Sequence, residues 1–224
     1  MMQVKKRMTA SPVTGTPKTS YNEAVRLLQE NGVRHLPIID KKGKLVGIVS
    51  LEDLLSAKPS GVSTLSVYEI ASLLETVRME KVMTTPVYAV DENCSLTNAA
   101  RFMIEKKIGC LPVLQDDKLV GIITDTDIFE TYVEIAGGGQ PGYRLEVKMP
   151  DEKGELAKIV QALAAAGSYI VSVALTYDKN EPVCYADIKE RDGDEKKIRE
   201  EIGKLDEMEL LTFRPHKEDK LLSF

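Results

Sequence analysis

Two nine-residue stretches decide the fold, because one repeats the other. Residues 45–53 read LVGIVSLED, and residues 119–127 read LVGIITDTD. Each stretch follows a Leu-Pro pair and, further upstream, a Met-Thr pair. The interval from Met-Thr to Leu-Pro is the same in both copies, from Met8 to Pro37 and from Met83 to Pro112. A repeat at fixed spacing indicates two copies of one supersecondary unit.

Each copy predicts the order strand, helix, strand, strand, helix. In the first copy, Ser20 precedes an apolar pattern of helical period that stops at Asn31 and Gly32. The apolar runs 36–39 and 45–49 then have the spacing of a hairpin. One copy holds only about 55 residues, which is marginal for a core of its own. We therefore expect the two copies to pack together.

The pattern changes after a glycine-rich segment, residues 137–142. Beyond it, residues 143–216 predict strand, helix, strand, strand, helix, strand, which is the order of a ferredoxin-like α+β domain. The fold class is therefore α/β, with a repeated pair followed by a smaller domain. The expected divisions are the first repeat (4–58), a connecting helix (59–78), the second repeat (79–136), a hinge (137–142), the C-terminal domain (143–216) and a tail (217–224).

Composition excludes several classes of function. The 224 residues include 35 acidic and 30 basic side chains, a net charge of -5 that does not favour a nucleic-acid partner. No apolar run approaches the ~18 residues of a spanning helix, so we expect no membrane association and a cytoplasmic location. The isolated cysteines Cys94, Cys110 and Cys184 suggest neither a disulfide framework nor a metal site.

The repeated motifs resemble tandem cystathionine-beta-synthase (CBS) domains, which associate as a Bateman module. The segment 149–159, MPDEKGELAKI, resembles the Asp-x-x-Gly-x-Leu turn of ACT domains. The combined order is similar to that of acetoin utilisation proteins. The resemblance implies a place in acetoin or related short-chain carbon metabolism.

The CBS resemblance implies an adenine nucleotide or adenosyl ligand, such as AMP, ADP, ATP or S-adenosylmethionine, in clefts between the copies. It places ribose contacts on Ser50 with Asp53 and on Thr124 with Asp127, where a carboxylate accepts both ribose hydroxyl protons. The second pair is the fuller match, because Leu51 replaces a polar residue in the first. Further ligand contacts are expected from Pro12, Val13, Arg34, His35, Pro37, Pro86, Val87, Cys110, Leu111 and Pro112.

Structural roles account for the same residues. Ser50-x-x-Asp53 and Thr124-x-x-Asp127 are close to the capping box of a helix N-terminus. Arg34 is either a phosphate ligand or a solvated side chain, and His35 either a hydrogen-bond donor to phosphate or a packed ring. Cys110 has no basic partner near it in sequence, so it is expected to be a small core residue rather than a nucleophile.

In the C-terminal domain, the resemblance implies an amino-acid ligand at the helix N-terminus, near Asp151, Gly154 and Leu156. The alternative is Asp151 as a helix cap and the sheet as a dimer surface. No group of residues suggests catalysis or a metal. We expect a regulatory, homodimeric, non-enzymatic protein; the alternatives are a ligand-free structural module and, third, an enzyme that turns over the bound metabolite.

Overall fold

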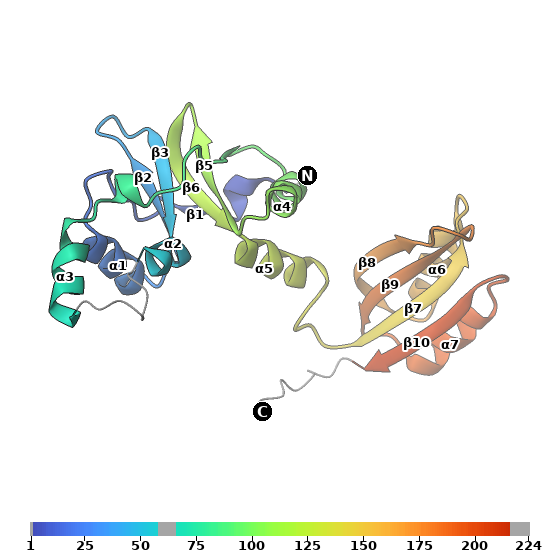
Figure 1. The fold of residues 1–224 in the computed structure, drawn as a ribbon. Coiled ribbons are helices and arrows are strands. Elements are labelled where there is room, and N and C mark those ends of the chain that lie inside the picture. Colours follow the sequence, from blue (N-terminus) through green and yellow to red (C-terminus); the bar gives the residue numbers. More distant parts are fainter. Residues whose placement is uncertain (1, 58–65, 216–224) are drawn as a thin grey trace. The chain divides into compact units, whose positions relative to one another are not determined.

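The computed structural model describes residues 2–57 and 66–215. The chain divides into two compact units, residues 1–129 and 130–224. Figure 1 labels their helices and strands. The predicted tail (217–224) and part of the predicted connecting helix (58–65) lie outside the described residues. The two units are described separately below.

The first repeat in the first unit has the predicted elements. They are η1 (Val4–Lys6), β1 (Thr9–Ala10), α1 (Tyr21–Glu30), β2 (His35–Ile39), β3 (Leu45–Ser50) and α2 (Leu51–Ser56). Ser20 caps α1 by accepting a hydrogen bond from the Glu23 amide at 3.3 Å, as its sequence pattern predicts. β2 and β3 pair antiparallel as the predicted hairpin.

The second repeat follows the same plan. After the connecting helix α3 (Val67–Thr76), its elements are η2 (Met79–Lys81), β4 (Val90–Asp91), α4 (Leu96–Lys106), β5 (Cys110–Gln115), β6 (Lys118–Thr124) and α5 (Asp125–Ile135). β5 and β6 form the equivalent antiparallel hairpin, and β4 runs parallel to β5. The described part of the predicted connecting helix is α3, which packs against α1 and contributes Leu74 to the core of the first repeat.

The two repeats exchange their N-terminal segments. β1 of the first repeat pairs with β6 of the second, Thr9 opposite Ile122. Thr84 of the second repeat likewise forms a bridge with Ile48 of β3. The helical turns follow the strands, since Val4 of η1 is fully buried in the second core and Met79 of η2 in the first. The repeats thus pack as one unit, which the short length of each copy predicts.

The Gly of each Leu-Val-Gly-Ile motif marks where these exchanged segments cross. A Cβ on Gly47 would overlap the sulfur of Met83, and a Cβ on Gly121 would overlap the sulfur of Met8. Each methionine therefore lies directly on the backbone of the other repeat's hairpin. A larger residue at either crossing would therefore force the methionine or the strand to shift.

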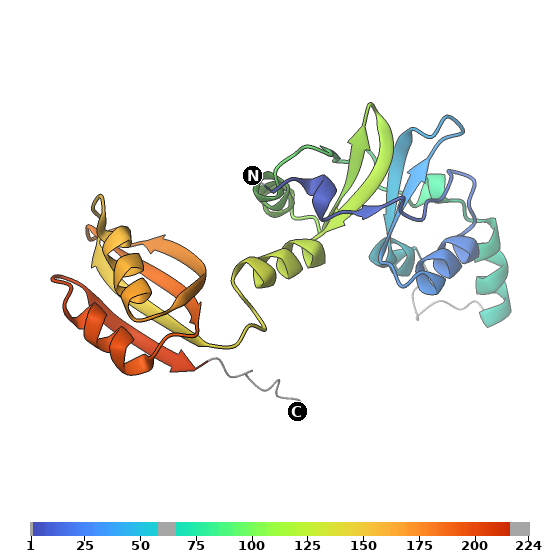
Figure 2. The ribbon, with the colours of Figure 1, turned by 180° about the vertical axis from the view of Figure 1, so that it is seen from behind.

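The second unit has the predicted order strand, helix, strand, strand, helix, strand. Its elements are β7 (Tyr143–Pro150), α6 (Glu155–Ala165), β8 (Tyr169–Tyr177), β9 (Val183–Arg191), α7 (Glu195–Gly203) and β10 (Glu209–Pro215). The antiparallel sheet has the order β10-β7-β9-β8, and both helices cover one of its faces (Figure 2). Its core lies between that face and the helices, where Val147, Ile159 and Ile188 are fully buried.

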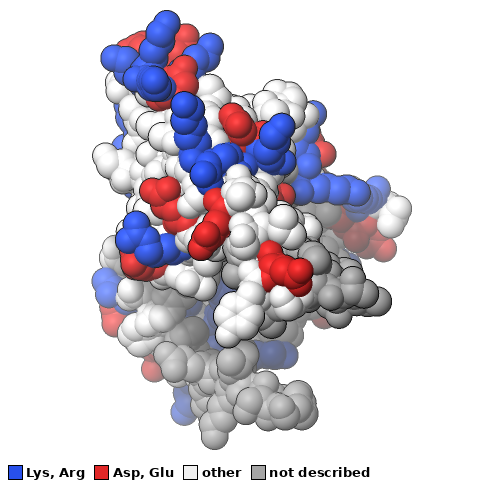
Figure 3. Space-filling view, turned by 60° about the vertical axis from the view of Figure 1, so that its left-hand side comes forward, with Lys and Arg blue, Asp and Glu red and all other residues white. Residues whose placement is uncertain are grey.

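Charged side chains of both signs are interspersed on the surface. On the face drawn in Figure 3, neither the basic nor the acidic side chains form a continuous region. Among the described residues, no helix combines the length and the apolar character that crossing a membrane requires.

Candidate functional site

Two clefts between the repeats of the first unit contain residues predicted for the ligand site. Cleft A has a volume of about 370 Å³ and is lined by His35, Ile48, Ser50, Glu52, Asp53, Thr84, Pro86, Val87, Tyr88, Lys107, Ile108, Gly109, Cys110 and Pro112. Cleft B has a volume of about 410 Å³ and is lined by Thr9, Ser11, Pro12, Val13, Asn31, Gly32, Val33, Arg34, His35, Ile122, Thr124, Thr126 and Asp127. Volumes of this size lie within the usual range for small-molecule sites.

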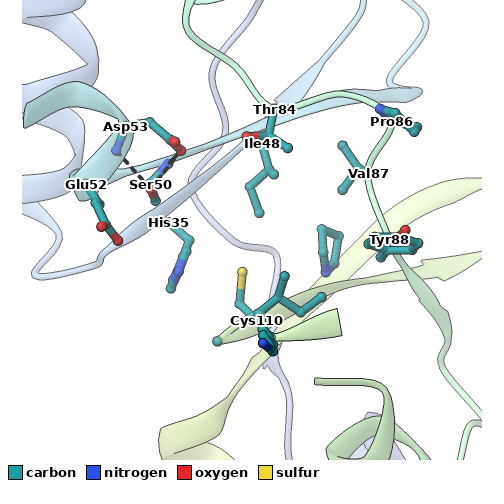
Figure 4. Close-up of a pocket in the computed structure, with 14 residues that line it drawn as sticks. His35, Ile48, Ser50, Glu52, Asp53, Thr84, Pro86, Val87, Tyr88 and Cys110 are labelled. Carbon is teal, nitrogen blue, oxygen red and sulfur yellow. Dashed lines mark hydrogen bonds between the residues drawn. The ribbon is translucent and has the colours of Figure 1, made fainter. Parts of the chain in front are cut away.

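The exchange of segments gives each cleft its walls. In cleft A, the helix start of the first repeat, with Ser50 and Asp53, faces the Pro86–Tyr88 segment that follows the second Met-Thr pair (Figure 4). In cleft B, Thr124 and Asp127 combine with Pro12 and Val13 from the first repeat. Each cleft therefore contains a Ser/Thr-x-x-Asp pair and a proline segment, from opposite repeats.

The Ser/Thr-x-x-Asp pairs form the helix caps that the alternative interpretation predicts. Asp53 Oδ2 accepts from the Ser50 amide and hydroxyl, both at 2.7 Å, and the Asp53 amide donates to Ser50 Oγ at 3.1 Å. Asp127 Oδ2 accepts from the Thr124 amide at 2.7 Å and from its hydroxyl at 2.8 Å. These bonds hold one carboxylate at the edge of each cleft, in a fixed orientation.

Arg34 makes the polar environment of cleft B different from that of cleft A. Its Nη2 donates to Thr126 Oγ1 at 3.3 Å and lies 3.5 Å from Asp125 Oδ1. The two side chains of this ion pair are 64% and 45% exposed, so the pair contributes little stability and the guanidinium can exchange partners. In the second repeat, Gly109 stands at the position of Arg34.

His35 and Cys110 are held in their uncharged forms. Burial lowers the pKa of His35, and the neighbouring Arg34 adds to this effect, against opposing effects of Asp125 and Asp53. Burial, assisted by Asp125, raises the pKa of the Cys110 thiol to about 12. Cys110 is therefore a thiol at neutral pH, consistent with the prediction that it packs rather than reacts.

Two residues predicted for the ligand site lie elsewhere. Leu111 is 1% exposed in the core of the second repeat, because strand alternation sends it away from the cleft that its neighbours Cys110 and Pro112 line. Pro37 is buried, lines neither cleft, and accepts a hydrogen bond from the Gly15 amide at 2.9 Å. The other predicted residues line one of the two clefts, and His35 lines both.

Several lining residues were not predicted. Glu52 and Thr126 stand between the Ser/Thr and Asp of their motifs, and a helix start exposes this position as well. Tyr88 and Lys107 also line cleft A. Lys106 lies over the Tyr88 ring, with Nζ 5.1 Å from the ring centroid. The sequence indicates Tyr88 and Lys107 as lining residues only by their positions, directly after Pro86-Val87 and at the end of α4.

A third cavity, of about 560 Å³, lies in the second unit. Asp151, Gly154 and Leu156, predicted for an amino-acid ligand, all line it, together with Leu175 and Tyr177 of β8. The alternative role for Asp151 is wrong, since the N-cap residue of α6 is Gly154 at φ 99° and the Asp151 amide donates to Pro182 O. No cluster of described His, Cys, Asp and Glu residues has an arrangement suited to a metal.

Comparison with known proteins assigns the first unit. The CBS domain model matches the chain twice, at residues 3–60 and 79–134, which together are half of its length. The chain belongs to the CBS-domain family. The two matches form a CBS pair, as the repeat predicts. These matches do not extend over residues 143–216, so the ACT assignment of the C-terminal domain stays a prediction.

Similar proteins also contain CBS pairs. CBSX1 of Arabidopsis thaliana, a chloroplastic CBS domain-containing protein, is 35% identical over 55% of the chain. A crystal structure of a candidate acetoin utilization protein (AcuB) from Vibrio cholerae is 38% identical, with a TM-score of 0.50 over 59% of this chain and 91% of that one. The matched region spans 60% of CBSX1 and 39% of the archaeal relative MJ1404 from Methanocaldococcus jannaschii.

Two further structures contain adenosyl ligands. CBSX2 in complex with AMP is 30% identical, with a TM-score of 0.52 over 60% of this chain and 99% of that one. The CBS pair of protein MJ0100, in complex with 5′-methylthioadenosine and S-adenosyl-L-methionine, is 29% identical, with a TM-score of 0.50 over 59% of this chain and 96% of that one. CBS pairs similar to this one thus bind adenosyl compounds.

Proposed function

We propose that the CBS pair is a sensor of an adenine nucleotide or adenosyl compound, and that it regulates rather than catalyses. The observation that supports this is the carboxylate of Asp53 or Asp127 fixed at the edge of a cleft between the repeats, opposite a proline segment. A ribose placed there presents two hydroxyl donors to a carboxylate acceptor. The adenosyl ligands of CBSX2 and MJ0100 support the same ligand class.

The mechanism follows from the position of the clefts between the two repeats. A ligand that contacts both walls binds best when the repeats adopt one mutual arrangement. Its binding shifts the conformational equilibrium by its difference in affinity between the two arrangements, and by no more. We propose that the second unit, as an ACT-like domain with a ligand of its own near Asp151, receives or adds a signal in a cytoplasmic homodimer. AcuB similarity supports acetoin utilisation as the pathway.

A structural module without a ligand is the second candidate function. It is favoured by one observation, namely that both Asp carboxylates already accept hydrogen bonds at their helix N-termini. In that case the Ser/Thr-x-x-Asp pairs serve only as caps. The two functions differ in whether any adenosyl compound stabilises the fold.

Thermal denaturation with AMP, ADP, ATP, S-adenosylmethionine and NAD tests the proposal. A ligand at about 100 times its dissociation constant should raise the free energy of unfolding by about 2.7 kcal/mol. Asp53→Asn and Asp127→Asn should each remove the response of one cleft. Asp194→Asn is the matched control, because Asp194 caps α7 in the second unit by accepting from the Lys197 amide. If no compound shifts the melting temperature, the pair is a structural module.

A further inference from the structure

The two clefts differ in charge at equivalent positions of the repeat. Glu52 of cleft A corresponds to Thr126 of cleft B, each one residue before the ribose carboxylate. Arg34 of cleft B corresponds to Gly109 of cleft A. Among the lining residues, cleft A thus has an additional carboxylate and cleft B has a guanidinium. Asp125, which stands at the position of Leu51, lines neither cleft and pairs with Arg34. The two clefts can be compared position by position, because each is formed by the equivalent elements of the two repeats.

In cleft B, the guanidinium lies beside the proposed ribose position. Arg34 donates to Thr126 Oγ1 at 3.3 Å, and Thr126 is adjacent in sequence to Asp127. In a nucleoside, the 5′ carbon is only a few bonds from the two ribose hydroxyls, so a 5′ substituent comes within reach of Arg34. The exposed pair with Asp125 is readily exchanged for a phosphate, with which guanidinium forms bidentate hydrogen bonds.

In cleft A, the same region is acidic. Glu52 and Asp53 both line it, on the side where His35 lies (Figure 4). Asp125 approaches from beyond Gly109, with Oδ2 3.3 Å from the position that a Cβ on Gly109 would take. The lining cation of this cleft is Lys107, which lies at the end of α4, two residues before Gly109. A phosphate beside Glu52 and Asp53 is disfavoured, whereas a neutral or positively charged group is accepted.

We propose that the two clefts sort adenosyl ligands by the charge of the 5′ substituent. Cleft B takes a nucleoside 5′-phosphate. Cleft A takes an adenosyl compound that carries a neutral thioether or a positively charged sulfonium in place of the phosphate. This inference rests on the proposed function, and it adds that the pair binds two classes of adenosyl compound at the same time, one in each cleft.

Calorimetric titration of the full chain with AMP and with S-adenosylmethionine tests the assignment. Arg34→Gln should weaken AMP binding by about tenfold or more, as expected for the loss of a charge-assisted hydrogen bond, and leave S-adenosylmethionine binding within about twofold. Glu52→Gln should weaken S-adenosylmethionine binding and leave AMP binding unchanged. Both side chains lie at the surface outside the capping bonds, so neither substitution threatens the fold. Saturation with one ligand should leave the other free to bind.

A transplanted site gives the complementary test. Glu52→Thr with Gly109→Arg introduces the charges of cleft B into cleft A, and AMP should then bind at two sites per chain. Competition of AMP and S-adenosylmethionine for one site, or equal loss of both ligands in Arg34→Gln, would overturn the inference while leaving adenosyl sensing intact. Binding of neither ligand to the parent chain would instead overturn the proposed function, and the inference with it.

Discussion

At the scale of single residues, the Asp of each Ser/Thr-x-x-Asp motif both caps a helix and lines a cleft. The same carboxylate that accepts the amide of Ser50 or Thr124 stands at the edge of a cleft. Sequence alone left capping and ligand binding as alternatives. The structure makes them compatible, because a carboxylate that accepts the capping hydrogen bonds still lies at the edge of its cleft.

Lys189 of the second unit is a basic residue in an unfavourable, buried environment. It is 0% exposed, and its Nζ has no hydrogen-bond partner among the described residues. Its cross-strand neighbour Arg144 is also a cation. Burial lowers the pKa of Lys189, and Arg144 adds to this effect against an opposing effect of Glu190. A buried cation without a partner destabilises the folded state.

Lys189→Met should therefore stabilise the second unit at pH 7, by about 1–3 kcal/mol, because it removes an unsatisfied buried group. The unfolded state binds the proton more tightly than the folded state does. The penalty is thus full below the folded pKa, and it is lost as the pH rises through that value towards 10.5.

Urea denaturation of parent and variant between pH 7 and pH 10 measures this difference. The advantage of the variant should shrink steadily with pH. Lys148→Met is the control, since Lys148 is partly exposed and pairs with Glu181 at 3.6 Å. A stability difference that does not depend on pH would show that the folded and unfolded states bind this proton equally, as expected for a Lys189 ammonium that reaches water.

At the scale of elements, the crossings at Gly47 and Gly121 hold the repeats together. Gly47→Ala should destabilise the first unit by about 1–3 kcal/mol, because the added Cβ overlaps the sulfur of Met83 in a packed region. Combining it with Met83→Ala should cost less than the sum of the two single changes, because the smaller side chain leaves room for the Cβ.

Chemical denaturation of the four proteins in this double-mutant cycle measures the coupling. Gly203→Ala is the control, because no atom lies within 4 Å of its added Cβ and alanine is the better helix former. Additive effects of Gly47→Ala and Met83→Ala would contradict the crossing.

The elements themselves were largely predictable, whereas the crossing was not. Periodicity and caps are local, so α1, the two hairpins and the order of elements in the second unit follow from neighbouring residues. The sequence does not show which hairpin a Met-Thr segment packs against, because both hairpins contain the same glycine. For the same reason, the two Ser/Thr-x-x-Asp pairs were predicted for separate clefts, but the proline segments that complete each cleft were not assigned to one or the other. The prediction of Leu111 as a ligand contact was avoidable, because strand alternation places its side chain on the opposite face from Cys110 and Pro112.

At the scale of the whole molecule, the two units have separate cores. The first unit contains one core in each repeat, and the second unit has its own between sheet and helices. The full chain should therefore unfold in two calorimetric transitions rather than one. All residues of clefts A and B belong to the first unit.

AMP should raise the midpoint of one transition and leave the other unchanged, since only one unit contains the clefts. Differential scanning calorimetry of the full chain measures both midpoints in one experiment. Asp127→Asn should abolish the shift without merging the transitions. An equal shift of both would mean that the units unfold together, and that ligand binding reaches the second unit by energetic coupling.

The exchanged segments have a consequence for cleavage of the backbone between the repeats and for the evolution of the pair. A break in the backbone between residues 57 and 66 would give two polypeptides, each with its Met-Thr segment and the short helical turn before it packed against the other. The two fragments should remain associated after proteolysis, and they should assemble when they are produced from separate genes. An ancestral single copy would have needed a twin to complete its own sheet.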